Sequence, residues 1–213
     1  MRRNAVNTRD HWNRIYTTQQ YDKVGWYEQE PTPSLELISR CRLGPTDPMI
    51  DVGAGSTTLI DHLLGVGYKN LYVLDHSEVA LDVLYSRLPR DQRKYVTVIE
   101  ADILNEEWIA QVGEVSLWHD RALLHFFVDP EDREAYAASL NRVVRVGGFA
   151  IISAFSLEGA DRCSGLAVHR YSLETLAELV GKNFLLEDGF DYAYRMPSGD
   201  IRPYIYALFK KKS

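Results

Sequence analysis

Short apolar runs alternate with helical segments through most of this sequence of 213 residues, and this alternation restricts the possible folds more than any other feature. A chain in which strands and helices alternate forms a parallel sheet with helices packed on both of its faces. The sequence therefore predicts an α/β protein. The expected parallel strands are residues 49–52, 71–74, 95–99, 115–118 and 149–152.

The segments between these runs carry the signals of helices, namely capping residues, apolar spacing, and a terminating glycine or proline. The expected helices are residues 8–16 with Thr8 as the cap, 33 to about 44, 57–64, 78–88, 132–146 and 172–180. The end of the chain differs, because 184–194 and 204–210 are strand-like and the turn-rich segment 196–200 joins them. That pattern indicates an antiparallel hairpin and a mixed sheet of about seven strands.

Composition and charge exclude several classes of protein. The net charge is −6, which argues against a nucleic-acid surface, since such surfaces carry a basic stripe. No apolar run approaches the ~20 residues that span a bilayer, so we expect no membrane segment. Nothing in the sequence has the composition of a linker, and we therefore expect one domain over residues 1–213.

The cysteines and the start of the chain indicate the compartment. Cys41 and Cys163 are far apart, and no Cys/His cluster predicts a metal site. Residues 1–7 are basic, but no apolar stretch follows them, which is unlike a secretory signal. We therefore expect a cytoplasmic protein with reduced thiols.

Polar and glycine residues follow four of the predicted strands, at the edge where open parallel sheets bind their ligands. The Gly53-Ala54-Gly55 turn joins the first strand to a helix, and Gly55 permits a ligand to approach the backbone closely. Asp75 ends the second strand at the spacing of a ribose-binding carboxylate. Thr58 stands where a dinucleotide-binding turn has its third glycine, which counts against a nicotinamide cofactor.

Two further strand ends carry chemistry. Asp102 follows the third strand, where its carboxylate can accept a hydrogen bond from an adenine amino group and Ile103 can offer an apolar face. His119 and Asp120 follow the fourth strand. Taken separately, each of these acids also fits a loop or a helix cap.

Together these motifs resemble those of the class I S-adenosylmethionine-dependent methyltransferases. The resemblance covers nearly the whole chain and rests on Ile50-Asp51-Val52-Gly53-Ala54-Gly55, Leu74-Asp75, Ala101-Asp102-Ile103 and Asp120. It implies a Rossmann-like sheet of order 3-2-1-4-5-7-6 whose last strand is antiparallel. It also implies S-adenosylmethionine as the cofactor, and methyl transfer by in-line displacement.

The resemblance divides between two branches of that family. Residues 64–68 and 75–77 are similar to a branch that contains protein-lysine methyltransferases. Residues 118–122 are more similar to the thiopurine methyltransferase branch and its small bacterial relatives. Arg121 stands where lysine-directed relatives have lysine, so we expect a small-molecule acceptor: a thiol, carboxylate, hydroxyl or amine. Protein lysine remains an alternative, and a nicotinamide oxidoreductase or a cofactor-binding module without catalysis is a more remote one.

The family roles carry over to single residues. The resemblance implies that the glycine turn passes under the methionine end, that Asp75 holds the ribose, and that His76, Asp102 and Ile103 border the adenine. His119 and Asp120 would lie near the sulfonium and amino group, and the catalytic cluster would be His119, Asp120 and Arg121. Residues 1–30 would form a lid over the cofactor with the aromatic side chains Trp12, Tyr16, Trp26 and Tyr27, although these residues also suit the core of a terminal helix.

Two other groups have weaker claims to the site. His125 lies in an apolar run and ranks below His119, because a structural histidine is more common in such surroundings. Residues 169–171 fit either the wall of an acceptor pocket or the start of the next helix.

Overall fold

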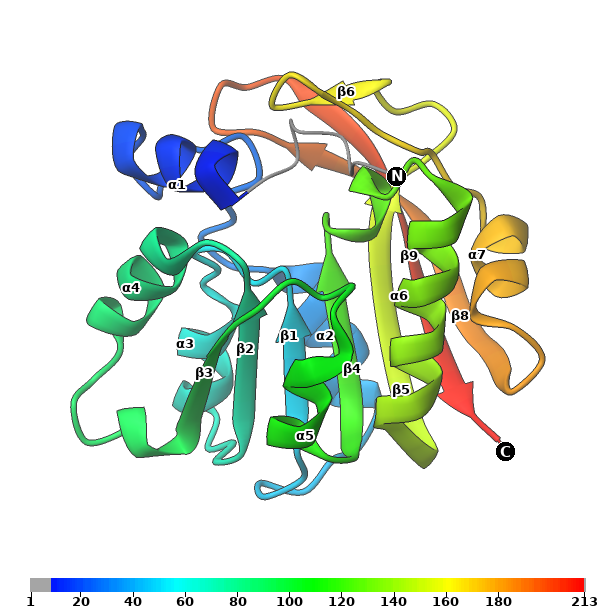
Figure 1. Ribbon diagram of the computed structural model, residues 1–213, viewed down its shortest axis with the longest axis horizontal. Helices are drawn as coiled ribbons and strands as arrows, with labels where there is room; N and C mark the ends of the chain where they lie inside the picture. Colours follow the sequence, from blue (N-terminus) through cyan, green and yellow to red (C-terminus); the bar gives the residue numbers. More distant parts are fainter. Residues whose placement is uncertain (1–8, 213) are drawn as a thin grey trace.

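The computed structural model describes residues 9–212 and contains a mixed sheet of seven strands in the order β3-β2-β1-β4-β5-β9-β8 (Figure 1). The first five pair in parallel, whereas β9 runs antiparallel to both β5 and β8. This is the expected order, since β6 and β7 form a separate small hairpin. The strands are β1 Met49–Val52, β2 Leu71–Asp75, β3 Val96–Glu100, β4 Val115–Arg121, β5 Val144–Phe155, β6 Arg162–Cys163, β7 Leu166–Ala167, β8 Phe184–Arg195 and β9 Ile201–Lys211.

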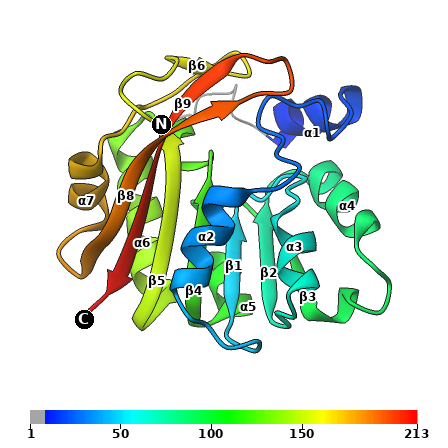
Figure 2. The ribbon, with the colours of Figure 1, turned by 180° about the vertical axis from the view of Figure 1, so that it is seen from behind.

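Helices cover both faces of the sheet, as the sequence predicts. α5, α6 and α7 lie on the face seen in Figure 1, and α2 and α3 lie on the face seen in Figure 2. The helices are α1 Arg9–Thr18, α2 Thr32–Arg40, α3 Leu59–Gly65, α4 Glu78–Arg87, α5 Ile109–Val112, α6 Pro130–Val143 and α7 Leu173–Val180, with 3₁₀ turns at Arg93–Tyr95, Glu106–Trp108 and Leu124–Phe126. The predicted cap Thr8 lies outside the described residues.

Successive side chains of a strand point to opposite sides of the sheet, and helices cover both sides, so each strand of the sheet contributes to two hydrophobic cores. Trp118 packs with Trp108 and Tyr136 in the core beneath α5 and α6. Leu117, its neighbour on β4, packs in the second core beneath α2 and α3. The same alternation places His119 and Arg121 on one face of β4 and Asp120 on the other.

Several boundaries differ from the predicted ones. α6 ends at Val143 rather than near Val146, because β5 already begins at Val144, which pairs with Val115. The pairing then shifts register before Leu117, and this irregularity accommodates Gly147 and Gly148 inside the strand. β9 begins at Ile201 rather than at Tyr204, because the hairpin pairing extends to Arg195. The β6–β7 hairpin and the short helix α5 were not expected.

The N-terminal helix lies at one end of the sheet rather than on a face. Figure 1 shows α1 above α4, and the β6 segment and the tips of β8 and β9 also arch over that end. No helix in the described part of the chain is both long enough and apolar enough to cross a lipid bilayer.

Candidate cofactor and acceptor site

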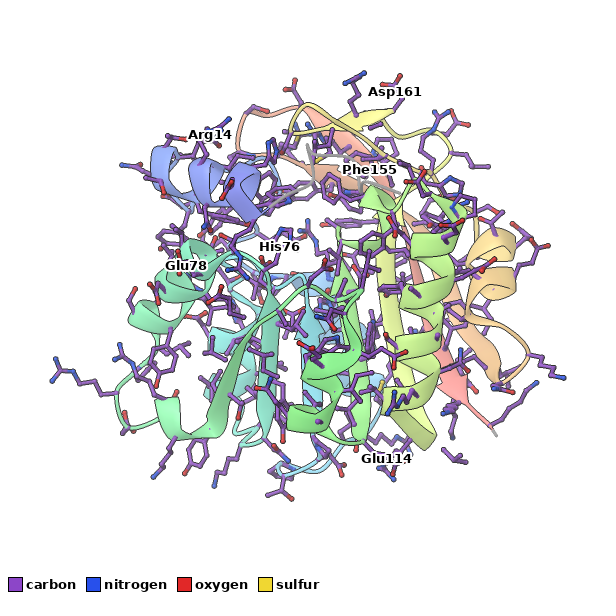
Figure 3. All side chains as sticks on the ribbon, viewed as in Figure 1. Arg14, His76, Glu78, Glu114, Phe155 and Asp161 are labelled. Carbon is purple, nitrogen blue, oxygen red and sulfur yellow. The ribbon has the colours of Figure 1, made fainter. Side chains whose placement is uncertain are left out.

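A cavity lies between the carboxyl ends of the central strands and residues 9–31, here called the N-terminal segment. It has about 1520 Å³ of open space, including its mouth. It therefore occupies the predicted edge of the sheet. Figure 3 shows His76 in this region, below α1. The predicted site residues that line it are Trp12, Tyr16, Trp26, Tyr27, Gly53, Ala54, Asp75, His76, Asp102, Ile103, His119 and Arg121.

The glycine turn and the strand-end acid are joined directly. Gly53 and Gly55 both have a positive φ, of 63° and 54°, a conformation that glycine adopts without strain. The backbone N–H of Gly55 donates to Asp75 Oδ2 at 2.8 Å, and that of Ser77 donates to Asp75 Oδ1 at 2.8 Å. Burial raises the pKa of Asp75 above its ordinary value. Each carboxylate oxygen retains a second lone pair for a ligand hydroxyl.

Asp102 and Ile103 form the wall beyond β3. The backbone N–H of Leu104 donates to Asp102 Oδ1 at 3.0 Å, which holds the carboxylate at the cavity. Ile103 is buried and contributes an apolar surface. Both residues therefore line the cavity beyond β3.

His119 lines the cavity, but both of its ring nitrogens have hydrogen-bond partners. Nδ1 lies 2.6 Å from Asp51 Oδ1 on β1, and Nε2 lies 2.8 Å from Ser34 Oγ on α2. All three side chains are buried. The network ties α2 to the central strands and leaves neither ring nitrogen of His119 without a protein partner.

Asp120 lies away from the cavity, because it points to the opposite face of β4 from His119 and Arg121. Its carboxylate accepts hydrogen bonds from the backbone N–H groups of Leu123 at 3.0 Å and Leu124 at 3.2 Å. Burial raises its pKa to about 7. The structure thus gives Asp120 a turn-closing position and does not bring it to the expected place beside the sulfonium.

Arg121 joins three parts of the chain that are distant in sequence. Its Nε lies 2.8 Å from Glu28 Oε2 and 3.2 Å from Tyr206 Oη, and its Nη1 donates to the carbonyl of Trp26 at 2.8 Å. The guanidinium also lies over the rings of Tyr194 and Tyr204. Arg121 therefore fastens the N-terminal segment to β4 and to the terminal hairpin.

Glu28 is the site residue that the sequence reasoning missed. It lines the cavity with only 8% of its side chain exposed, and its charge partner Arg121 is 93 residues away in sequence. Burial raises its pKa, and the positive charge of Arg121 opposes that rise. A signal was present, because an acid directly after the aromatic pair Trp26-Tyr27 is unusual for a solvated loop.

The aromatic residues of the N-terminal segment cover the glycine turn. The indole N–H of Trp26 donates to the hydroxyl of Tyr16 at 3.1 Å, and a side chain at Gly55 would collide with that hydroxyl. Trp12 packs edge-on against Trp26 and against Phe126. Because these side chains line the cavity, they do more than fill the core of a terminal helix.

The weaker candidates lie elsewhere. Residues 169–171 do not line the cavity: Tyr171 is buried, and Ser172 next to it caps α7. His125 is buried against Phe126 and Phe155, and burial lowers its pKa to about 3. Its two ring nitrogens have no hydrogen-bond partner among the described residues.

Comparisons with known proteins identify the family and the fold. Residues 50–152 match the model of a methyltransferase domain family. The chain belongs to the class I S-adenosylmethionine-dependent methyltransferases. Over 160 residues it is 27% identical to the EEF1A lysine methyltransferase 2 of Mus musculus, a match that covers 70% of this chain and 66% of the mouse protein.

Solved structures share the fold of this methyltransferase. An S-adenosylmethionine-dependent methyltransferase from Anabaena variabilis superposes with a TM-score of 0.76 at 16% identity, covering 96% of this chain and 93% of its own. The 1,6-didemethyltoxoflavin-N1-methyltransferase of Burkholderia thailandensis, solved with its substrate and S-adenosylhomocysteine, gives 0.73 at 18% identity, covering 96% and 87%.

The residues of the cavity fit S-adenosylmethionine, which supplies an activated methyl group. Gly53 and Ala54 of the glycine turn line the cavity, whereas Gly55 lies beneath the Tyr16 hydroxyl. Asp75 offers hydrogen-bond acceptors for the ribose, and Asp102 with Ile103 suits an adenine edge. The aromatic faces of Trp12, Tyr16 and Trp26 suit a sulfonium cation.

Proposed function

We propose that this methyltransferase acts on a small-molecule acceptor that binds beneath the N-terminal segment. The observation that carries the proposal is the way this segment is fastened over the cavity. Arg121 holds Trp26 and Glu28, while the hydroxyl of Thr58 donates to the carbonyl of Glu28 at 2.8 Å. An acceptor enclosed in this way is shielded from water, as methyl transfer requires.

Within this proposal the residues divide into two groups. Gly53, Ala54, Gly55, Asp75, His76, Asp102 and Ile103 hold the cofactor, with Trp12, Tyr16 and Trp26 as its lid. His119 and Arg121 shape the acceptor side as positioning residues, His119 through Asp51 and Ser34, and Arg121 through Glu28. Asp120 stabilises the turn after β4 by accepting hydrogen bonds from its backbone N–H groups.

Release of S-adenosylhomocysteine tests the proposal. Purified protein with S-adenosylmethionine is offered small thiols, amines, acids and alcohols in one arm and lysine-containing peptides in the other. We expect turnover with small acceptors. Turnover on peptides or intact lysate proteins alone would overturn the small-molecule assignment.

Protein lysine is the second candidate, and the similarity to EEF1A lysine methyltransferase 2 favours it. It requires the N-terminal segment to open far enough to admit a side chain that is attached to a protein. Elongation factor 1A is therefore included as one acceptor in the peptide and protein arm.

A further inference from the structure

The cavity carries a strong excess of acidic groups. Among the described residues that line it, Arg121 is the single arginine, lysine is absent, and the two imidazoles are those of His76 and His119. An acidic cleft attracts cations and disfavours anions, because the potentials of its charges add in a region of low dielectric constant. The carboxylates in the lining belong to Glu28, Asp51, Asp75, Asp102, Asp129 and Asp132.

Three of these acids are held away from the expected position of the acceptor by their own hydrogen bonds. Asp51 is bonded to His119, and Asp75 is bonded to the glycine turn. Asp102 stands on the adenine side, beyond β3. Glu28 differs, because it comes from the N-terminal segment and lies beside the aromatic residues that cover the methionine end.

Arg121 is poorly placed to receive an anionic acceptor. Its Nε and Nη1 are occupied by Glu28, Tyr206 and the carbonyl of Trp26. Its Nη2 is buried and has no hydrogen-bond partner within residues 9–212. A thiolate or carboxylate at this nitrogen would lie close to the negative charge of Glu28, which is paired with the same guanidinium.

We propose that the acceptor is a small amine and that Glu28 binds its ammonium group and takes its proton. This inference rests on the proposed function and names its substrate class. Glu28 can share its charge in this way because Arg121 is also held by Tyr206, the carbonyl of Trp26 and two tyrosine rings. Burial, which raises the pKa of Glu28, makes the carboxylate a better proton acceptor.

The reaction balances with these groups alone. The acceptor ammonium transfers one proton to the Glu28 carboxylate and becomes a neutral amine. The nitrogen lone pair forms the N–C bond to the methyl carbon as the C–S bond of the donor breaks, and the bonding electrons remain on sulfur. The product leaves as a methylated ammonium ion with S-adenosylhomocysteine, and Glu28 then releases its proton to solvent.

Four probes that share a phenethyl group test the acceptor class: phenethylamine, 2-phenylethanethiol, 3-phenylpropionate and 2-phenylethanol. Each is assayed with S-adenosylmethionine, and its binding to protein loaded with S-adenosylhomocysteine is measured by calorimetry. We expect phenethylamine to be methylated fastest. Glu28→Gln should lower its kcat/KM by roughly 10- to 100-fold, the effect of losing a hydrogen bond to a charged group.

The controls separate recognition from folding. The same Glu28→Gln variant should still bind S-adenosylhomocysteine, since the glutamine amide oxygen can accept a hydrogen bond from Arg121, and any loss of this affinity should be smaller than the loss of kcat/KM. Glu30→Gln, at an exposed acid of the same segment, should change neither measurement. If Glu28→Gln does not fold, the wild-type protein still decides. Phenethyltrimethylammonium, a permanent cation, should bind the loaded protein at least about tenfold more tightly than 3-phenylpropionate.

Each other outcome has a definite meaning. Faster methylation of the thiol, the acid or the alcohol overturns the amine inference and leaves the small-molecule function standing. Unchanged phenethylamine kinetics in Glu28→Gln, or no binding of either cationic probe, also overturns it. Methylation confined to peptide lysine, and lost in Glu28→Gln, would overturn the small-molecule function while supporting the amine and the role of Glu28.

Discussion

Asp75 accepts a hydrogen bond from the backbone N–H of Gly55 at 2.8 Å, so the acid at the end of β2 and the glycine turn after β1 form one unit. Asp75→Ala should therefore remove both a ribose contact and the support of the turn. We expect the affinity for S-adenosylhomocysteine to fall by roughly 10- to 100-fold, as measured by calorimetry. The matched control is Asp82→Ala, an exposed acid on α4. Equal affinity in Asp75→Ala and wild type would contradict the assignment.

Asp102 should select the base of the cofactor. Its carboxylate is placed to accept a hydrogen bond from the adenine amino group, which inosine lacks. Asp102→Ala should therefore weaken the binding of S-adenosylhomocysteine and reduce its advantage over S-inosylhomocysteine. Competition between the two nucleosides measures this ratio, and an undiminished preference for adenine in the variant would show that Asp102 does not read the base.

The N-terminal segment should become more protected when the cofactor product binds. Trp12, Tyr16 and Trp26 line the cavity, and a ligand beneath them adds contacts that favour the closed arrangement. Hydrogen exchange of residues 9–27 should slow in saturating S-adenosylhomocysteine, and fluorescence of a variant that retains only Trp12 and Trp26 should change. Exchange that does not respond to the ligand would indicate a static terminal helix instead of a lid.

Arg121→Met should loosen the same segment without any ligand. The substitution removes the contacts to Glu28, Trp26 and Tyr206 and leaves Glu28 buried without its partner. We expect faster hydrogen exchange over residues 21–31 and a lower melting temperature, whereas α6 on the opposite face should keep its exchange rates. Arg133→Met serves as a control that removes a partly buried arginine of α6, whose guanidinium donates to the carbonyls of Phe127 and Val128.

Asp120 should make stability depend on pH between about 4 and 7. Its folded pKa is about 7 against an ordinary value of 3.8, so the folded protein holds the proton more tightly. The stabilising contribution is fully present below the ordinary value and is lost as the pH rises through the folded pKa. Relative to Asp120→Asn, the wild-type free energy of unfolding in urea should decline across this range. Parallel pH profiles for the two proteins would show that Asp120 does not titrate in it.

Much of this site is local in sequence and was predictable. The Gly53-Ala54-Gly55 turn, Asp75 and Asp102 each follow an apolar strand, and parallel strands place such ends at one edge. The strand order was also expected. The first residues of β5 and β9 were not predictable, because pairing with a neighbouring strand decides them. The irregular register opposite β4 sets the start of β5, and the extent of the β8–β9 hairpin sets the start of β9.

The sequence by itself determined the fold class and the edge at which the glycine turn and the strand-end acids meet, because period, turn residues and spacing act over a few positions. The resemblance of those motifs indicated the family. Only the tertiary structure decided what the cluster after β4 does. Alternation along the strand turns Asp120 away from the cavity, and hydrogen bonds to Asp51 on β1 and Ser34 on α2 occupy both nitrogens of His119. The pairing of Arg121 with Glu28 joins residues 93 positions apart, and such a contact forms only when the packed sheet brings the N-terminal segment over its edge.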